Sequence, residues 1–198
     1  MKLTSKNFTD GTRIPGDNAF CFPDGTGHAQ LGGNRNPQLA WSGLPTGTRS
    51  LVVICNDPDV PTRADDVNQD GRTVPASLPR TDFTHWVLID LAPAGEIAEG
   101  EFSSAVTPCG KPGPAGPRGT RQGINDYTAW FAGDEQMKGD YHGYDGPCPP
   151  WNDEIVHRYV FTLYALDIER LPLAGRFTAL DARRAMSGHV LGEAHLTG

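Results

Sequence analysis

Three stretches of the chain are almost continuously apolar, and turn-forming residues lie at the ends of each. They are residues 49–55 (RSLVVIC), 82–92 (DFTHWVLIDLA) and 157–167 (HRYVFTLYALD). β-Branched and aromatic residues favour strands, and a nearly continuous apolar run is typical of a strand that is covered on both faces. We therefore expect these three segments to form a central sheet.

The regions between and beyond these runs predict shorter elements. Residues 38–44 (QLAWSGL) are expected to form a short strand, whereas residues 107–124 are too rich in proline and glycine for regular structure. Beyond Pro172, apolar side chains recur at helical spacing after Thr178, a residue type that commonly caps helices. The recurring positions are Ala182, Ala185, Met186, His189 and Val190. One C-terminal helix is therefore expected to pack on the sheet, although Gly188 weakens it by roughly 1 kcal/mol relative to alanine.

The composition agrees with a mainly β chain. Glycine (24 residues) and proline (17 residues) are spread through the 198 residues, which is typical of many short elements joined by shaped loops rather than of a helical bundle. A hydrophobic content of 37% is enough for a substantial core. The length predicts one domain spanning residues 1–198.

The charge pattern argues against several partners. The formal net charge is −7, and the lysines and arginines are scattered, so no basic stripe is available for nucleic acid. The first residues contain no apolar segment, so we expect neither a secretion signal nor stable membrane insertion, and we expect a cytoplasmic protein. The four cysteines lack a CxxC pair, which argues against a zinc knuckle, and in a reducing compartment they are expected to be thiols. They are Cys21, Cys55, Cys109 and Cys148.

Two short polar motifs adjoin the predicted central strands. Asp57 and Asp59 follow the first strand, where Pro58 fixes its own φ angle and keeps Asp57 extended. His85 and Trp86 begin the second strand, in which neighbouring side chains face opposite sides. Each motif alone is more typical of an ordinary turn or strand end than of a site.

A third motif, GPCPP at residues 146–150, precedes the third strand. Because proline has no backbone N–H, the amides of Gly146, Cys148 and Trp151 are the donors available there. Such a stiff loop costs little entropy to hold in one shape, and it would present an amide beside His157 as a small anion-binding concavity. A nearby carboxylate would favour the protonated, charged form of this histidine.

These motifs together resemble the phosphatidylethanolamine-binding proteins, and more closely their bacterial, Raf kinase inhibitor-like branch. The resembling blocks are DPDVP (57–61), THWVLIDL (84–91), GPCPP followed by HRYVFTLYALD (146–167), the segment GGNRNPQLAWSGLPTGTRSLVVICNDPDVP (32–61) and the step GINDY (123–127). They occur in the family's order. The resemblance implies a β-sandwich-like fold with a large central sheet, a smaller sheet on one side and helices on the other, including a C-terminal helix.

The resemblance also implies a pocket for phosphate-type anions and phospholipid head groups, with no cofactor, no metal and no catalytic residue. Carried over to this sequence, the ligand-binding residues are Asp57, His85, Gly146, Cys148, His157 and Tyr159, and the supporting residues are Asp59, Trp86 and Pro149. In this arrangement the aspartate orients a histidine, the two imidazoles and a loop amide donate to the anion, and the tyrosine closes the wall. Arg158 points the other way and is expected to be a structural ion-pair partner.

Two other functions are considered beside the binding protein. Cys148 with His157 and Asp57 would form the nucleophilic group of a hydrolase. Alternatively, the pocket is vestigial and the protein is a dimeric interaction module, as relatives in bacteria can be dimeric. The last 20 residues contain no Phe, Tyr or Trp, so regulation of a kinase through an aromatic C-terminal helix is not carried over. The acidic stretch 66–71 resembles the start of a calcium-binding loop but lacks its twelfth ligand, so a solvated loop is favoured.

Overall fold

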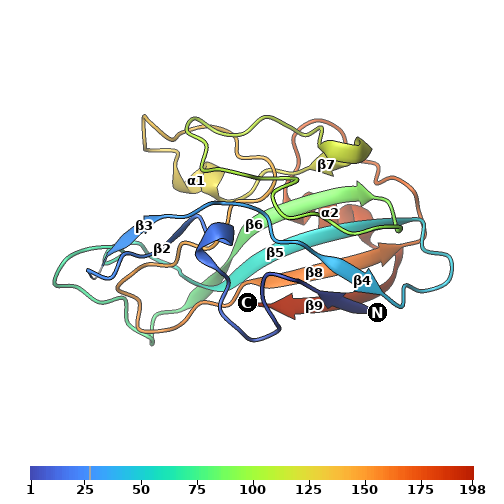
Figure 1. Ribbon diagram of the computed structural model, residues 1–198. Coiled ribbons are helices and arrows are strands. Elements are labelled where there is room, and N and C mark those ends of the chain that lie inside the picture. Colours follow the sequence, from blue (N-terminus) through green and yellow to red (C-terminus); the bar gives the residue numbers. More distant parts are fainter. Residues whose placement is uncertain (27) are drawn as a thin grey trace.

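The computed structural model describes residues 1–26 and 28–198, and it is built around one antiparallel five-stranded sheet (Figure 1). In order across the sheet, the strands are β7 (Arg121–Gln122), β6 (Arg80–Leu91), β5 (Ser50–Pro61), β8 (Val160–Leu166) and β9 (Val190–Thr197). The three predicted apolar segments are thus confirmed as the central strands β5, β6 and β8.

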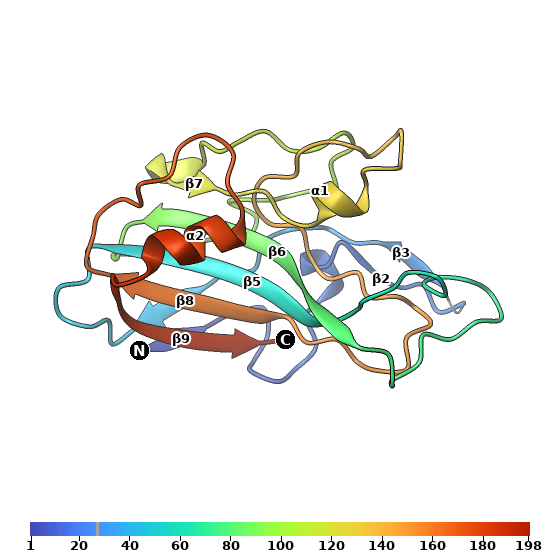
Figure 2. The same cartoon turned by 180° about the vertical axis from the view of Figure 1, so that it is seen from behind.

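Smaller elements cover this sheet. Strand β1 (Lys2–Thr4) pairs with β4 (Ala40–Ser42), which confirms the short strand predicted within residues 38–44, and β2 (Cys21–Pro23) pairs with β3 (Ala29–Leu31). Helix α2 (Ala179–Met186) lies across one face of the sheet and the β1–β4 pair across the other, as the two opposite views show (Figures 1 and 2). The remaining helical segments are η1 (Gly16–Asn18), η2 (Pro117–Gly119) and the one-turn helix α1 (Tyr127–Trp130).

The central strands bury both of their faces. In β5, Leu51, Val53 and Cys55 pack into the cluster shared with β1 and β4, whereas Val52 and Ile54 pack into the cluster beneath α2. Consecutive side chains of a strand point to opposite faces, so a strand that is covered twice needs apolar residues at every position. This explains why the apolar runs of the sequence do not alternate.

Strand β5 is longer than the apolar pattern predicts. The DPDVP motif forms the last residues of this strand rather than following it, and pairing with β6 continues as far as Pro61. The register shifts between Asp57 and Val60, so Pro58 occupies an irregular part of the ladder. Proline donates no hydrogen bond, and such irregular positions are where a sheet tolerates it.

The end of the chain differs from the prediction. The cap at Thr178 is present, because its hydroxyl accepts from the Asp181 N–H and the Asp181 carboxylate accepts from the Thr178 N–H. However, Gly188 adopts a left-handed φ of 83°, which ends the helical region, and His189 and Val190 lie beyond it. The predicted C-terminal helix is therefore present as α2, but it ends before His189 and Val190, and the last element of the chain is strand β9 along β8.

Residues 107–124 are irregular apart from η2 and the two-residue strand β7, as their composition predicts. Over the residues described, no helix combines the length and the apolar character needed to cross a membrane.

Candidate functional site

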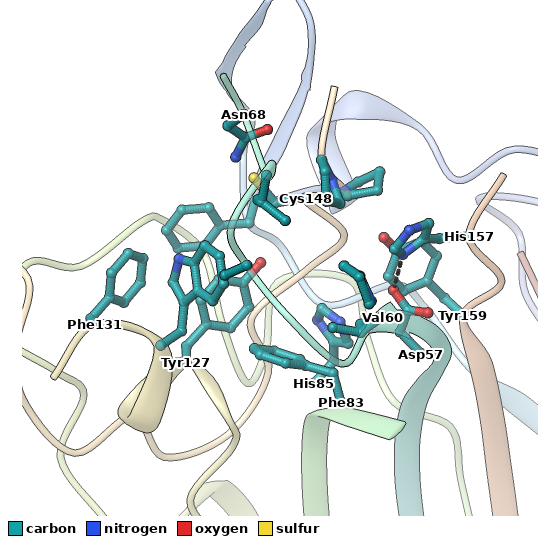
Figure 3. Close-up of a pocket in the computed structure, with 17 residues that line it drawn as sticks. Asp57, Val60, Asn68, Phe83, His85, Tyr127, Phe131, Cys148, His157 and Tyr159 are labelled. Atoms are coloured by element: carbon teal, nitrogen blue, oxygen red, sulfur yellow. Dashed lines mark hydrogen bonds and ion pairs between the residues drawn. The ribbon is translucent and has the colours of Figure 1, made fainter. Parts of the chain in front are cut away.

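A cavity of about 160 Å³ lies where the C-terminal end of β5 and the N-terminal end of β6 meet the proline loop (Figure 3). Its volume is well above the ~10–15 Å³ that a single water molecule requires. The lining residues are Phe20, Asp57, Val60, Pro61, Ala64, Val67, Asn68, Phe83, His85, Tyr127, Trp130, Phe131, Cys148, Pro149, Pro150, His157 and Tyr159.

The structure brings most of the predicted site residues to this one cavity. Asp57 comes from β5, His85 from β6, Cys148 from the proline loop, and His157 and Tyr159 from the segment leading into β8. Pro149 lines the cavity as well. Segments separated by about a hundred residues thus meet because β5 is the sheet neighbour of both β6 and β8.

His157 is fixed by two carboxylates. Its Nδ1 lies 2.6 Å from Asp57 Oδ2 and its Nε2 lies 3.2 Å from Asp153 Oδ2. Burial alone would lower the pKa of His157, but the two carboxylates outweigh it and raise the pKa. The charged imidazolium donates both of its N–H groups to protein, while Arg80 pairs with the second carboxylate. His157 therefore has no N–H left for a ligand, contrary to the expectation that both imidazoles donate to an anion.

Asp59 lies beside this network and pairs with Arg158. The Asp59 N–H donates to Asp57 Oδ1 over 2.8 Å, and the Asp59 carboxylate accepts from the backbone and guanidinium of Arg158. The hydrogen bonds from Arg158 lower the pKa of Asp59. Arg158 is therefore confirmed as a structural ion-pair partner, and Asp59 orients the carboxylate that holds His157.

His85 is in the opposite state. Its Nδ1 lies 2.7 Å from the carbonyl oxygen of Asp145, which only accepts, so Nδ1 carries a proton. Burial lowers the pKa of His85 and outweighs the opposing carboxylates of Asp57, Asp145 and Asp126. In the neutral ring, Nε2 carries a lone pair and no proton. Within the described residues, Nε2 makes no hydrogen bond. This nitrogen is available to a guest.

Asp145, which the sequence did not indicate, holds His85 in place. Its buried carboxylate accepts from Asn34 Nδ2 and Asn125 Nδ2, each over 2.7 Å, and lies 2.8 Å from Lys111 Nζ. Both asparagines lie in segments that resemble family blocks, but nothing in the sequence pairs them with this acid. The carbonyl beneath His85 is therefore part of a rigid buried network.

The hydroxyl of Tyr159 is buried and finds no partner in the part of the chain that the structure describes. Its ring packs edge-on against His85, with centroids 5.1 Å apart. Buried hydroxyl groups usually have a partner, because leaving one unpaired costs about 1–3 kcal/mol. Tyr159 is thus a polar group beside His85 that the fold leaves unsatisfied.

The proline loop supplies fewer donors than expected. The Gly146 N–H donates to Asn34 Oδ1 and the Trp151 N–H donates to Asn68 Oδ1. Only the Cys148 N–H, of these three amides, has no acceptor among residues 1–26 and 28–198. Of the three predicted amides, one remains for a ligand.

Besides Asp59, two predicted residues lie outside the cavity lining. A Cβ on Gly146 would approach the Asn18 carbonyl oxygen to 2.4 Å, so this glycine permits close packing of the loop on η1. Trp86 faces the core shared with β1 and β4, where it contacts Phe102 and Tyr144. Both stabilise the surroundings of the site.

Cys148 forms a disulfide with Cys21, so the expectation of four thiols was wrong. The two residues are 127 positions apart, and their pairing depends on β2 packing beside the proline loop, which spacing alone does not reveal. Within a disulfide, Cys148 has no thiolate, so the hydrolase centred on it is excluded in this state. Disulfides persist in oxidising compartments, which weighs against the predicted cytoplasmic location.

An aromatic wall of the cavity was not predicted from the sequence. It consists of Phe20, Phe83, Tyr127, Trp130 and Phe131, of which three belong to or directly follow helix α1. The run YTAWF at 127–131 was a visible signal, but a four-residue helix is too short for its periodicity to be read. The acidic stretch 66–71 is held by Arg72 and His28, and no metal-binding cluster occurs in the described part of the chain.

Comparison with known proteins identifies the family. The sequence profile of the family described as phosphatidylethanolamine-binding protein matches residues 4–198. The chain belongs to the phosphatidylethanolamine-binding protein family. Membership supports a non-catalytic binding protein in general terms.

Individual relatives agree with this assignment. A UPF0098 protein of Methanothermobacter thermautotrophicus is 34% identical over all of this chain and 97% of its own length. The UPF0098 protein YbhB of Escherichia coli is 33% identical over 86% of this chain and 81% of its own length. A crystal structure of a putative phosphatidylethanolamine-binding protein homologue, CT736 of Chlamydia trachomatis, is 29% identical, with a TM-score of 0.65 over 100% of this chain and 94% of that one. The crystal structure of E. coli YbcL, with a TM-score of 0.67 over 99% and 94%, is 23% identical and supports the fold.

Proposed function

We propose that this protein is a non-enzymatic binding protein whose cavity takes a small anion of the phosphate type, such as a phosphorylated small molecule or a phospholipid head group. The observation that carries the proposal is the unpartnered hydroxyl of Tyr159 beside the open Nε2 of His85 in one buried cavity. The Cys148 N–H on the loop is a third polar group without a partner in the described part of the chain. An oxygen-rich guest would satisfy all three groups.

Charge balance predicts how such an anion binds. The carboxylates of Asp57 and Asp153 are offset by His157 and Arg80, so the cavity floor carries little net charge when empty. Neutral His85 presents a lone pair, which repels an anionic oxygen. A phosphate monoester dianion has no proton to offer this lone pair, so its binding is accompanied by uptake of one proton, which lies between His85 Nε2 and the anion.

Calorimetry tests this proposal. Inorganic phosphate and phosphoethanolamine are titrated at pH 7.5 in two buffers with different heats of ionisation, and the difference in heat measures proton uptake. We expect saturable binding of both ligands, uptake close to one proton for phosphoethanolamine, and loss of that uptake in His85→Gln. His195→Gln, on the exposed edge strand β9, is the matched control. Absence of binding heat together with unchanged NMR signals of His85 and His157 would reject the proposal.

Location and assembly remain predictions. The sequence favours the cytoplasm and the disulfide favours an oxidising compartment, so fractionation followed by thiol labelling of Cys21 and Cys148 is the decisive measurement. Light scattering after size exclusion tests the predicted homodimer.

A further inference from the structure

The two sides of the cavity differ in chemistry. Figure 3 shows His157, Asp57 and Tyr159 on one side and Tyr127 and Phe131 on the other. His85 lies at the junction, with ring centroids 5.1 Å from Tyr159 and 5.6 Å from Tyr127. A ligand whose acidic group meets His85 can therefore extend the rest of its structure along the aromatic wall defined above.

This wall is formed before any ligand arrives. The Asp126 N–H donates to the Thr84 carbonyl and the Asp126 carboxylate accepts from the Thr84 N–H, which fixes the start of α1 to β6. The Tyr127 hydroxyl donates to the Gly146 carbonyl over 2.9 Å. Because these rings are already held, a guest that packs on them pays little additional ordering entropy.

The ring orientations select the kind of guest. Phe20 and Tyr127 are stacked, with centroids 4.7 Å apart and planes 20° apart, and Tyr127 and Phe131 are stacked at 5.5 Å and 25°. The Phe20 and Phe131 centroids are 5.8 Å apart, so the three rings form one cluster in which the faces partly cover one another instead of surrounding a common point. An ammonium group needs ring faces, which carry the negative part of the quadrupole, whereas the ring edges are positive and attract the face of another ring.

The outer end of the wall also favours an aromatic guest over an ammonium group. Trp130 lines the cavity yet is 48% exposed, a large apolar area that the fold leaves uncovered. Single exposed aromatic residues are ordinary, but this one continues a wall that begins in the buried part of the cavity. A flat apolar group bound along the wall would cover part of its indole ring.

We infer that the cavity selects a small aryl acid, that is, an aromatic ring joined to a phosphate-type group. This inference rests on the proposed function, because the acidic group is placed at His85 and Tyr159. The aryl ring lies against Tyr127, Phe131 and Trp130. Neither a bare anion nor an anion with an alkylammonium group uses this wall.

Four phosphate monoesters test the inference by calorimetry at one pH: methyl phosphate, phenyl phosphate, cyclohexyl phosphate and phosphocholine. We expect phenyl phosphate to bind about tenfold more tightly than methyl phosphate, with cyclohexyl phosphate between them, since ring–ring contacts stabilise the complex beyond the burial of apolar area. Phosphocholine should bind no better than methyl phosphate.

Variants locate the effect. In Trp130→Leu and Phe131→Leu the ratio of phenyl phosphate affinity to methyl phosphate affinity should fall about three- to tenfold. Phe22→Leu is the matched control, because Phe22 is half-buried on β2 and does not line the cavity. Its ratio should equal that of the parent protein.

The outcomes separate the two proposals. If methyl and phenyl phosphate bind equally, if cyclohexyl phosphate matches phenyl phosphate, or if phosphocholine binds most tightly, aryl selection is overturned while the anion-binding function stands. If none of the four compounds binds, both are overturned. If the ratio of phenyl phosphate affinity to methyl phosphate affinity is unchanged in both Trp130→Leu and Phe131→Leu, the inference is also overturned.

Discussion

Two histidines in one cavity have opposite charge states, and the difference comes from the atoms around them. His157 is bracketed by Asp57 and Asp153, which stabilise its proton, whereas His85 meets a neutral carbonyl and is desolvated. The first histidine therefore works as a cross-link within the protein. The second is the group that remains free to exchange a proton with a guest.

The His157 cross-link should contribute strongly to stability. In His157→Ala, two buried carboxylates lose their shared cation, and removing one partner of a buried ion pair typically costs about 3–5 kcal/mol. Urea unfolding of the variant and of the surface control His195→Ala measures the difference. A loss of unfolding free energy smaller than that of His195→Ala would show that solvent already screens the network.

The two histidines should also titrate on opposite sides of pH 6.5, the ordinary value for the side chain. The raised pKa of His157 contributes stability that is complete below pH 6.5 and is lost as the pH rises through its value in the folded protein. The lowered pKa of His85 contributes stability above pH 6.5 that is lost as the pH falls through its folded value. NMR titration of the two rings gives the direction of both pKa shifts. A pKa of His85 above that of His157 would contradict the role of His157 as the link between the two carboxylates.

Among the elements, the proline loop matters most for the cavity, because it carries Cys148 and Pro149 and is tied to β2 through Cys21. Three of its five residues are prolines, so the loop is stiff between its attachment points. Position and rigidity of this side of the cavity are thus set by one covalent bond and by restricted backbone angles.

Cutting the bond between Cys21 and Cys148 should lower the free energy of unfolding. A cross-link of this kind typically stabilises a protein by about 2–4 kcal/mol by restricting the unfolded chain. Denaturation of Cys21→Ala and of the reduced parent protein should agree, while Cys109→Ala, at an exposed free thiol, should behave as the parent. Phosphate affinity should fall together with stability. Unchanged affinity after reduction would mean that the prolines alone hold the loop.

The elements also show how far the sequence could be read. The central strands were predictable because double coverage produces uninterrupted apolar runs, and the site residues were found through motifs on those strands. Strand β9 was missed because it is an edge strand whose exposed Val190 and Leu191 break any alternation. The aromatic wall and the disulfide were missed because both depend on which loops become neighbours, and short segments carry no periodic signal of that.

For the whole molecule, the sheet determines where binding is possible. Its faces are covered by α2 and by the β1–β4 pair, and the cavity for which we argue a ligand lies beyond the strand ends. Loops from the first, middle and last parts of the chain gather there (Figure 1). A ligand bound at this point contacts all of them at once.

Ligand binding should therefore stabilise the entire fold. At a phenyl phosphate concentration of 100 times the dissociation constant, the free energy of unfolding should rise by about 2.7 kcal/mol. For a chain of this size that corresponds to an increase in melting temperature of roughly 5–11 °C. Scanning calorimetry with phenyl phosphate and with sodium chloride at equal ionic strength makes the comparison, and equal shifts in both would indicate a salt effect only.

The disulfide between β2 and the proline loop has a consequence for biosynthesis. As the polypeptide leaves the ribosome, the partner of Cys21 is not made until residue 148, and His157 follows later still. A nascent chain that stops before this point contains every residue of the aromatic wall, but it lacks Cys148 for the disulfide and His157 for the link between the two carboxylates. The complete binding cavity thus forms only when the polypeptide is nearly finished. A fragment that ends before Cys148 should not bind the ligand.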